Sequence, residues 1–561
     1  MLLRNKIPTM VLVAVIFLGL LTGCHYGAKN NQDYSNIKME QPVTLTMVRG
    51  EDPSAKFKNG ESYADNVHTR WARDTLGVNL KTLWSAPLSD GTYDTKLKLM
   101  LSSGDQLPDV LVSTQNDTTS RFVESGKVLN VGKAFDQYAS STWKAAMKEV
   151  PSAWEPFMKD GEKYAIPIIR PTMGTQPVLW IRQDWLDKLH LKAPTNLEEL
   201  EMVMDAFVNR DPDGNGKKDT LALDFGMKEQ LSGYPIGNIL WIFGLFGAIP
   251  ERWYPDENGQ LQYGSVQPGI KQALSKIKEW KNKGYIANDI ALHDFNKVTE
   301  GIASGEVGMV GSESWFSEYP GSMTLANNPT ARYTPYPLPK GENGENLRSV
   351  GVPYSGAILI SKDISKEAMQ AFFHYMNALY EVYETQDPLY FQAYQDGYDF
   401  KIQDGKVYFD NEHIPGGRVQ TMKYSLIGSL LSFPSRDLET TLKMARGETL
   451  TNKDLVTSAF GGLVCNDTSN RTEETSSKAV LISMVQTDAD VREYFQGPAT
   501  ATMKIRNAWL KKMQMDTFIE IIYGNRPLES FDAFVHKWRS SGGDEITEEV
   551  NEWYRSVQGI K

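Results

Sequence analysis

The chain has 561 residues, of which 23% are charged and 41% hydrophobic, and its formal net charge is -11. At typical domain sizes, this length predicts two to four domains that bury their own cores without disulfide bonds. Because no basic run stands out beyond the first residues, the acidic balance argues against nucleic acid as a ligand.

The N-terminus has the pattern of a bacterial lipoprotein signal peptide. A positively charged start precedes a nearly unbroken apolar run over residues 11–21, and Leu21-Thr22-Gly23-Cys24 closes the segment. An uncleaved transmembrane anchor is the alternative, but the run is shorter than the roughly 20 residues that span hydrocarbon. We therefore predict a signal peptide over residues 1–23 and a lipid-bearing Cys24, with palmitate as the expected acyl chain. The mature protein would then be anchored to the extracytoplasmic face of the cell membrane.

The only other cysteine is Cys465, which has no partner if Cys24 is acylated. A disulfide framework is therefore excluded. Residues 24–41 are polar and aperiodic, as is typical of a flexible tether.

The folded body begins with alternating strand and helix patterns. Alternating apolar residues predict strands over Val43–Val48 and Val78–Trp84, and a short apolar run covers Asp109–Val112. Helices are predicted over Tyr63–Leu76, which Gly77 ends, and over Tyr93–Ser103. This alternation favours an α/β fold.

The middle of the chain repeats this pattern. We predict helices over Asn196–Val208, Pro268–Lys283 and Ala368–Tyr383, each with apolar residues at helical spacing. An Asn-Gly turn within Tyr254–Tyr263 predicts a β-hairpin.

A loop with the spacing of a calcium site follows the first of these three helices. Asp211, Asp213, Asn215 and Asp219 occupy positions 1, 3, 5 and 9 of an EF-hand loop, Gly216 occupies position 6, and the Lys217 carbonyl can serve position 7. Ala222 stands at position 12, where the family of such loops has a bidentate Glu. The alternative is a polar turn capped by its own Asp and Asn side chains. We predict a structural calcium ion here.

Catalytic motifs are lacking. The sequence has no HExxH, no G-x-S-x-G, no P-loop and no Rossmann glycine pattern. Carboxylate pairs for glycoside hydrolysis remain open, because 70 acidic residues always offer candidates and their separation depends on the fold. We predict that the protein is not an enzyme.

Several segments, in their order, resemble the family 1 extracellular solute-binding lipoproteins of ATP-binding cassette (ABC) importers. They are Gly104–Asp109, Trp180–Leu189, the calcium-like loop, Phe295–Trp315 and the tail from Gly542 to Tyr554. The longer members, similar to alginate-binding proteins, have two α/β lobes with a ligand cleft between them and hinge segments that cross from one to the other.

The resemblance implies a domain organisation. Residues 42–165 and 335–385 are expected to form the N-terminal lobe, and residues 166–334 and 386–561 the C-terminal lobe. The crossings are expected near Tyr164–Ile168 and Tyr333–Leu338.

The resemblance also implies capture of an oligosaccharide by lobe closure and its delivery to an ABC permease. Sugar faces stack on aromatic rings, and Trp315, Trp84 and Tyr354 are the residues we predict for that role, although burial in the core is an equal alternative for each. A secreted glycan-active enzyme and a peptide-binding lipoprotein remain the competing functions.

Overall fold

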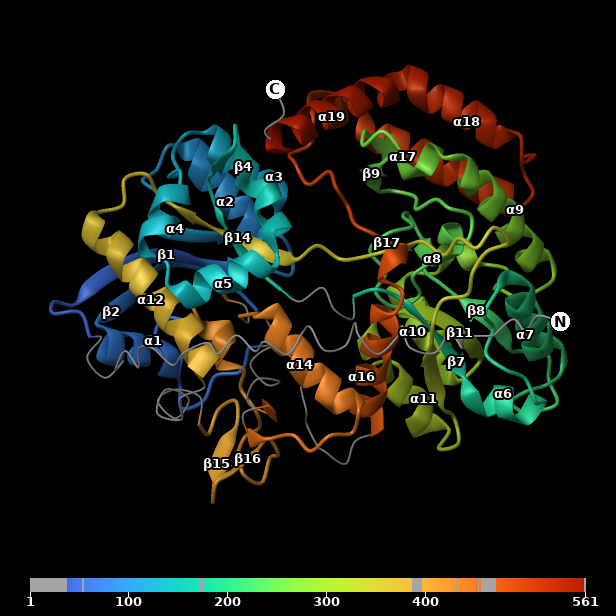
Figure 1. The fold of residues 1–561 in the computed structure, drawn as a ribbon, viewed down its shortest axis with the longest axis horizontal. Helices are drawn as coiled ribbons and strands as arrows, with labels where there is room; N and C mark the ends of the chain where they lie inside the picture. Colours follow the sequence, from blue (N-terminus) through green and yellow to red (C-terminus); the bar gives the residue numbers. More distant parts are fainter. Residues whose placement is uncertain are drawn as a thin grey trace, which may run out of the picture.

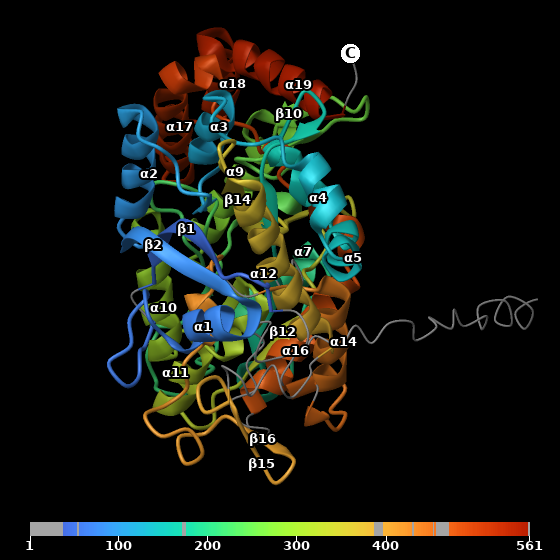
Figure 2. The same cartoon turned by 90° about the vertical axis from the view of Figure 1, so that its left-hand side faces the viewer.

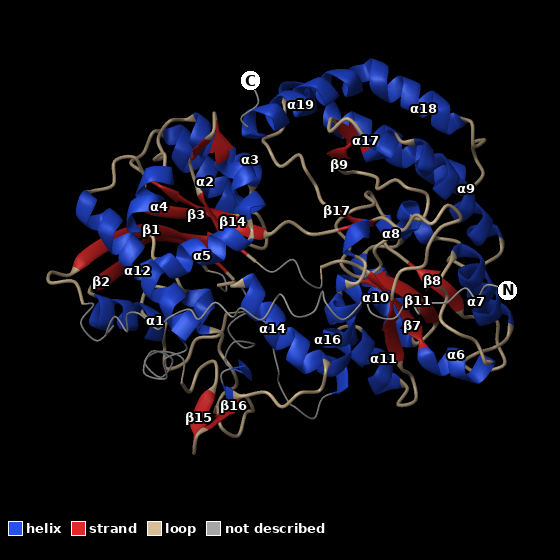
Figure 3. Ribbon diagram, in the orientation of Figure 1, coloured by secondary structure: helices blue, strands red, loops and turns tan. Residues whose placement is uncertain are grey.

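The computed structural model describes residues 38–558, apart from residues 53–54, 171–174, 386–395, 429–430, 453 and 456–470. The predicted lipidation site Cys24, the signal peptide and Cys465 lie outside the described residues. Two α/β lobes lie side by side, each built around its own mainly buried sheet (Figures 1 and 3). This arrangement is the predicted two-lobe fold.

The first lobe contains a five-stranded mixed sheet in the order β2-β1-β3-β14-β6. Strands β1, β2 and β3 are parallel, whereas β14 pairs antiparallel with both β3 and β6. The strands are β1 (Val43–Glu51), β2 (Val78–Pro87), β3 (Val110–Ser113), β6 (Ile166–Ile169) and β14 (Tyr354–Ile360).

Helices cover both faces of this sheet (Figures 1 and 2). They are α1 (Val67–Trp71), which continues as a π-helical turn over Ala72–Leu76, α2 (Thr92–Ser103), α3 (Asn116–Glu124), α4 (Gly132–Tyr138), α5 (Ser141–Glu149) and α12 (Lys366–Thr385). Helix α14 (Pro434–Ala445) packs against α5 of this lobe and against α16 (Arg471–Met484) of the second. A 3-10 segment over Pro151–Phe157 and the short strands β4 (Met158–Lys159) and β5 (Glu162–Lys163) precede β6. The predicted helix over 63–76 starts later than expected, because Asn66 caps the backbone of His68 and Thr69.

The second lobe contains a four-stranded sheet in the order β12-β7-β11-β8. Strand β7 is antiparallel to β11 and β12, and β8 is parallel to β11. The strands are β7 (Val178–Arg182), β8 (Leu221–Asp224), β11 (Val307–Ser312) and β12 (Tyr333–Tyr336).

The helices of the second lobe are more numerous and include the C-terminal ones, α17 to α19, which lie together along the top of this lobe in Figure 1. They are α6 (Gln183–Leu189), α7 (Leu197–Asn209), α8 (Leu240–Gly244), α9 (Pro268–Asn282), α10 (Phe295–Ser304), α11 (Gly321–Asn327), α16 (Arg471–Met484), α17 (Ala501–Ile522), α18 (Ser530–Trp538) and α19 (Asp544–Gln558). Short ladders join β9 (Trp253–Pro255) to β10 (Leu261–Tyr263) and β13 (Arg348–Ser349) to β17 (Asp490–Val491). The hairpin predicted over 254–263 and the helices predicted at 196–208, 268–283 and 368–383 are confirmed within two residues.

One part of the chain belongs to a different lobe than expected. Residues 396–445, including the hairpin of β15 (Lys401–Gln403) and β16 (Lys406–Tyr408), were assigned to the C-terminal lobe, but they pack against the first lobe. Phe400, Leu426 and Leu431 join its hydrophobic core, and the Asp437 carboxylate accepts a hydrogen bond from the Tyr383 hydroxyl. Their apolar side chains complete this core, a contact between distant segments that sequence periodicity does not reveal.

The crossings between the lobes also lie later than expected. Residues 166–169 form β6 of the first lobe, so that crossing follows Ile169. Residues 333–336 form β12 of the second lobe, and Leu338 remains there through two hydrogen bonds with Gln486, so the second crossing lies just before β14.

The two crossing segments run beside each other. The Arg170 backbone N–H donates to the Pro353 carbonyl at 3.1 Å, and the Gly351 N–H donates to the Thr175 hydroxyl at 3.2 Å. These two hydrogen bonds link the segments, which together we call the hinge. The chain also passes from the first lobe to the second between α14 and α16.

Candidate ligand-binding site

Two pockets flank the carboxyl end of β3. Thr114, just after this strand, lines one pocket, and Asn116, at the start of α3, lines the other. In open α/β sheets, ligands bind outside the carboxyl ends of the parallel strands. The smaller pocket occupies that position on the first lobe, and the larger one borders it only through Asn116.

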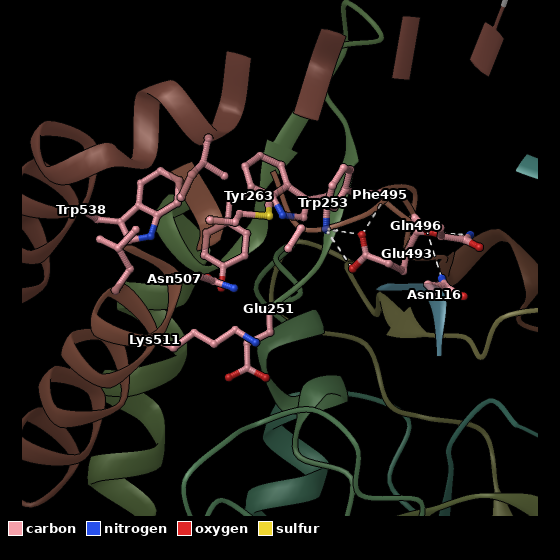
Figure 4. A pocket seen from close by; sticks show the side chains of 15 residues that line it. Asn116, Glu251, Trp253, Tyr263, Glu493, Phe495, Gln496, Asn507, Lys511 and Trp538 are labelled. Carbon is pink, nitrogen blue, oxygen red and sulfur yellow. Dashed lines mark hydrogen bonds between the residues drawn. The ribbon is translucent and has the colours of Figure 1, made fainter. Parts of the chain in front are cut away.

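The larger pocket has a volume of about 300 Å³ and lies where the second lobe meets α3 (Figure 4). Trp253, Tyr263 and Trp538 form its aromatic side, with the rings of Tyr263 and Trp538 stacked at 5.1 Å between centroids. The polar groups are Asn116, Glu251, Glu493, Gln496, Asn507 and Lys511. Aromatic surface next to convergent amides and charged groups is typical of a site for a polar organic ligand.

Glu493 is held at this pocket by backbone groups. Its carboxylate accepts hydrogen bonds from the N–H of Trp253 at 3.2 Å and from that of Phe495 at 2.9 Å. Burial raises the pKa of Glu493 to about 7, against the opposing effect of the Arg252 charge and of these two N–H groups. The carboxyl group therefore changes charge near neutral pH.

Asn116 connects the two lobes at the edge of this pocket. Its Nδ2 donates to the Tyr354 hydroxyl of β14 at 2.8 Å and to the Gln496 carbonyl of the second lobe at 3.2 Å. The larger pocket is thus lined by Asn116 of the first lobe and otherwise by residues of the second.

The smaller pocket, of about 160 Å³, lies at the carboxyl ends of β1 and β3. Arg49 and Gly50 of β1 line it together with Thr114, Ser355 and the segment Leu426–Gly428. Thr114 of the smaller pocket and Asn116 of the larger one are two positions apart, so the pockets are neighbours at the end of β3.

The comparisons with known proteins decide the family. The profile of the family described as bacterial extracellular solute-binding protein matches residues 54–378, more than half of the chain. The chain belongs to this solute-binding family.

Two relatives match the chain over different lengths. The chain is 24% identical over 566 residues to lipoprotein LipO of Bacillus subtilis, covering 99% of both chains. It is 25% identical over 374 residues to the fructooligosaccharide ABC transporter substrate-binding protein FusA of Streptococcus pneumoniae, covering 62% of this chain and 64% of FusA.

Solved structures show the same fold. An HMO-binding, ABC-transporter-associated solute-binding protein from Bifidobacterium longum infantis has a TM-score of 0.64 at 16% identity, covering 93% of this chain and 100% of its own. An EF-hand mutant of FusA in complex with fructo-nystose has a TM-score of 0.57 at 16% identity, covering 92% and 100%.

Of the three predicted stacking residues of this solute-binding protein, Trp315 has the most suitable position. It follows β11 directly, at the carboxyl edge of the second-lobe sheet, and its half-buried indole donates to the Glu313 carboxylate at 2.8 Å. Burial raises the pKa of Glu313, whereas the Trp315 N–H and the Arg170 charge lower it. Since Arg170 belongs to the hinge, Trp315 lies close to the crossing between the lobes. Its role in stacking remains a prediction.

Tyr354 and Trp84 are placed differently. The Tyr354 ring is 6% exposed and packs edge-on against Phe157, so only its hydroxyl reaches the site, through Asn116. Trp84 lies on the edge strand β2, where its ring packs against Tyr93 and under the Lys96 ammonium, 4.8 Å from the ring centroid. Neither Trp84 nor Trp315 lines either of the two pockets, and the structure does not bring these two residues together there.

Sequence reasoning missed Asn116 and Glu493. The position of Asn116 directly after a predicted apolar strand is a usable signal, because loops at strand ends bind ligands in this fold class. Glu493 has no such signal, since its burial depends on Trp253, 240 positions earlier.

The calcium-like loop forms a compact turn between α7 and β8. The Asp211 carboxylate accepts from the N–H groups of Gly214 and Gly216, and the Asn215 side chain donates to the carboxylates of Asp213 and Asp219 at 2.7 and 3.1 Å. Burial, together with a hydrogen bond to Asp211, raises the pKa of Asp213.

Two side-chain oxygens that follow this loop in the sequence have other partners. The Thr220 hydroxyl donates to the Phe207 carbonyl, and Asp224 is buried against His293 at 2.7 Å. Among the described residues, no group of three or more His, Cys, Asp or Glu is arranged to hold a metal ion. A site here would therefore depend on the Asn215 amide and the Lys217 carbonyl as well as on carboxylates.

Within the described part of the chain, no helix has both the length and the apolar character needed to cross a bilayer.

Proposed function

We propose that this solute-binding protein is a membrane-tethered extracellular receptor that captures an oligosaccharide between its lobes and delivers it to an ABC permease. The observation that supports it most is the larger pocket, where Asn116 of the first lobe meets aromatic and hydrogen-bonding residues of the second. The name of FusA, a fructooligosaccharide-binding relative, supports the ligand class.

The mechanism needs no chemical step on the ligand. A ligand that contacts both lobes has a higher affinity for the closed arrangement than for the open one, so its binding shifts the population toward closure. Sugar hydroxyls would meet the amides of Asn116 and Asn507 and the charges of Glu493 and Lys511, while a ring face would meet the aromatic side of the same pocket. Trp315 lines neither pocket, so stacking on it is a separate part of the proposal.

The tether is part of the proposal. Acylation of Cys24 would hold the receptor at the membrane, and the lipoprotein relative LipO supports it. Attachment beside the permease raises the effective concentration of the loaded receptor. Mass spectrometry of protein from a membrane fraction tests this, because a Cys24→Ala variant should lose the acyl mass and appear in the culture medium.

A structural calcium ion in the loop 211–219 is the second part of the proposal. The carboxylates of Asp213 and Asp219 accept from the Asn215 side chain, and the same turn contains the Asp211 carboxylate. Carboxylate and carbonyl oxygens are the ligands that calcium prefers. The relative FusA has an EF-hand, as the name of its mutant states. A complete EF-hand has an acidic residue at position 12, where this chain has Ala222. We therefore expect calcium to bind more weakly here than in a complete EF-hand.

The function is tested by thermal shift with a panel of neutral and acidic oligosaccharides and of peptides. Stabilisation by an oligosaccharide, followed by recovery of the intact ligand, is the expected result. Stabilisation by peptides alone would favour the peptide-binding alternative, and recovery of shortened sugars would favour the enzyme. The absence of any shift would reject the proposal.

A further inference from the structure

Arg49 is a buried cation without an acidic partner. Among the described residues, three arginines are at most 3% exposed, namely Arg49, Arg182 and Arg348. Arg182 pairs with Asp184 at 2.6 Å and Arg348 with Asp490 at 2.5 Å. No described carboxylate lies within ion-pair distance of Arg49. Since a buried unpaired charge is destabilising, this exception needs a reason.

The contacts of Arg49 are neutral. Its Nη2 donates to the Lys423 carbonyl at 2.6 Å, and its guanidinium carbon lies 4.7 Å from the centroid of the Tyr63 ring. The Nε atom is buried and has no hydrogen-bond partner. Burial lowers the pKa of Arg49 to about 10, against the effect of nearby tyrosines, so the side chain stays charged at neutral pH.

Of these three arginines, Arg49 is also the one that lines a ligand-sized pocket. It lies at the carboxyl end of β1, in the smaller pocket beside Thr114, whose hydroxyl group can donate a hydrogen bond, and Ser355, whose hydroxyl donates to the Ile168 carbonyl at 3.5 Å. The same pocket has apolar walls from Leu88 and Leu426, which exclude water and strengthen an ionic contact.

We propose that the smaller pocket binds the carboxylate of an acidic sugar residue, with Arg49 as its cationic partner. This inference rests on the proposed function and narrows it to oligosaccharides that contain uronic acids. Guanidinium and carboxylate groups match in shape and charge. A phosphate dianion fits less well, because the pocket offers a single cation for its two charges.

The neighbouring pockets allow one ligand to reach both. Thr114 lines the smaller pocket and Asn116 the larger one, two positions further along the chain. An oligosaccharide whose acidic sugar residue lies at Arg49 could therefore place its next sugar residues against the aromatic and amide groups of the larger pocket. The negative net charge of the protein does not assist an acidic ligand, which makes a specific local cation necessary.

Calorimetry with pairs of ligands tests the inference. Uronic acid oligosaccharides from pectin and alginate are compared with the same oligosaccharides after reduction of each carboxyl group to a hydroxymethyl group. The wild-type protein should bind an acidic member at least about 10-fold more tightly than its reduced counterpart, which corresponds to 1.4 kcal/mol. The Arg49→Gln variant should lose this preference, and Arg49→Lys should retain part of it.

Arg332→Gln is the matched control, because Arg332 is exposed and pairs with Asp187 away from both pockets. Its preference should equal that of the wild type. If Arg49→Gln does not fold, the comparison of acidic and reduced ligands on the wild-type protein still tests whether the site prefers a carboxylate.

Equal or tighter binding of neutral oligosaccharides would overturn the inference and leave the proposed function standing. A loss of thermal stability in Arg49→Gln with an unchanged preference would assign Arg49 to holding residues 421–424 against β1, and would overturn it too. Binding of inorganic phosphate that depends on Arg49, without any preference for acidic sugars, would also contradict it. If no oligosaccharide of either kind binds, the proposed function fails, and this inference with it.

Discussion

Glu155 and Arg492 form an ion pair between the two lobes, with 3.3 Å between Oε1 and Nη2. Glu155 lies in the 3-10 segment before β4 of the first lobe, and Arg492 follows β17 of the second. The Arg492 guanidinium also lies over the Tyr494 ring, 4.1 Å from its centroid. The pair is therefore positioned to influence how closely the lobes approach.

We predict that Glu155→Gln favours the open arrangement. Both side chains are partly exposed, so the pair contributes about 1 kcal/mol or less, and ligand affinity should fall by about 2- to 5-fold. Small-angle X-ray scattering should show a larger radius of gyration without ligand. Glu384→Gln, which breaks a pair with Arg436 inside the first lobe, should leave the radius unchanged. Equal radii for wild type and Glu155→Gln would contradict the prediction.

Trp315 and Trp84 should differ in their effect on binding. Trp315→Ala removes a ring at the carboxyl edge of the second-lobe sheet, and we expect the affinity for the oligosaccharide to fall by at least about 10-fold. Trp84→Ala removes a ring that packs against Tyr93, so it should lower the melting temperature and leave affinity within about 2-fold. Calorimetry on both variants checks this, and a larger loss of affinity in Trp84→Ala would reverse the assignment.

Removal of calcium should lower stability. A bound cation stabilises only the folded loop, so a chelator should reduce the melting temperature, and added calcium should restore it. Asp213→Asn should abolish the response to chelator. The matched variant Asp136→Asn, at an exposed position of α4, should respond like the wild type. A wild-type protein with no response, and with no copurified metal, would show that the loop is only a polar turn.

The charge of Glu493 should make stability depend on pH. Its folded pKa of about 7 lies above the ordinary Glu value of about 4.3, so between these values the folded state holds a proton that the unfolded state has lost. The contribution of Glu493 to stability is therefore fully present below pH 4.3 and is lost as the pH rises to 7.

Glu493→Gln keeps an acceptor for the N–H groups of Trp253 and Phe495 but cannot ionise. The free energy of unfolding of this variant, taken relative to that of the wild type, should rise by on the order of 1 kcal/mol between pH 5 and pH 8. Denaturant unfolding at the two pH values measures it, with exposed Glu552→Gln as the control. A difference between variant and wild type that is the same at both pH values would contradict the prediction.

Local patterns in the sequence predicted the elements well, and long-range packing poorly. Strands β1 and β2 and helices α2, α7, α9 and α12 follow from periodicity and capping, because these signals are contained within each segment. The assignment of residues 396–445 failed because Phe400 and Leu426 are apolar positions that either lobe would accept. The predicted position of the hinge was wrong for a similar reason. Residues Ile166–Ile169 would be extended both in a segment that crosses between the lobes and in a strand that pairs with β14.

The candidate site was predictable only in part. Trp315 could be placed at a strand end from its position after an apolar run, whereas Tyr354 faces the core because β14 is buried on both sides. The smaller pocket depends on Leu426 approaching β1 from 377 positions away, and no local pattern contains that information.

The position of β14 between β3 and β6 has a consequence for biosynthesis. The first-lobe sheet cannot close until residue 360 has left the ribosome or the export channel, because its fourth strand comes from beyond the whole second-lobe sheet. Until then, the inner edges of β3 and β6 are unpaired and prone to pairing with other chains. Truncated forms that end before residue 354 should therefore aggregate, and the two lobes should gain their final structure together rather than one after the other.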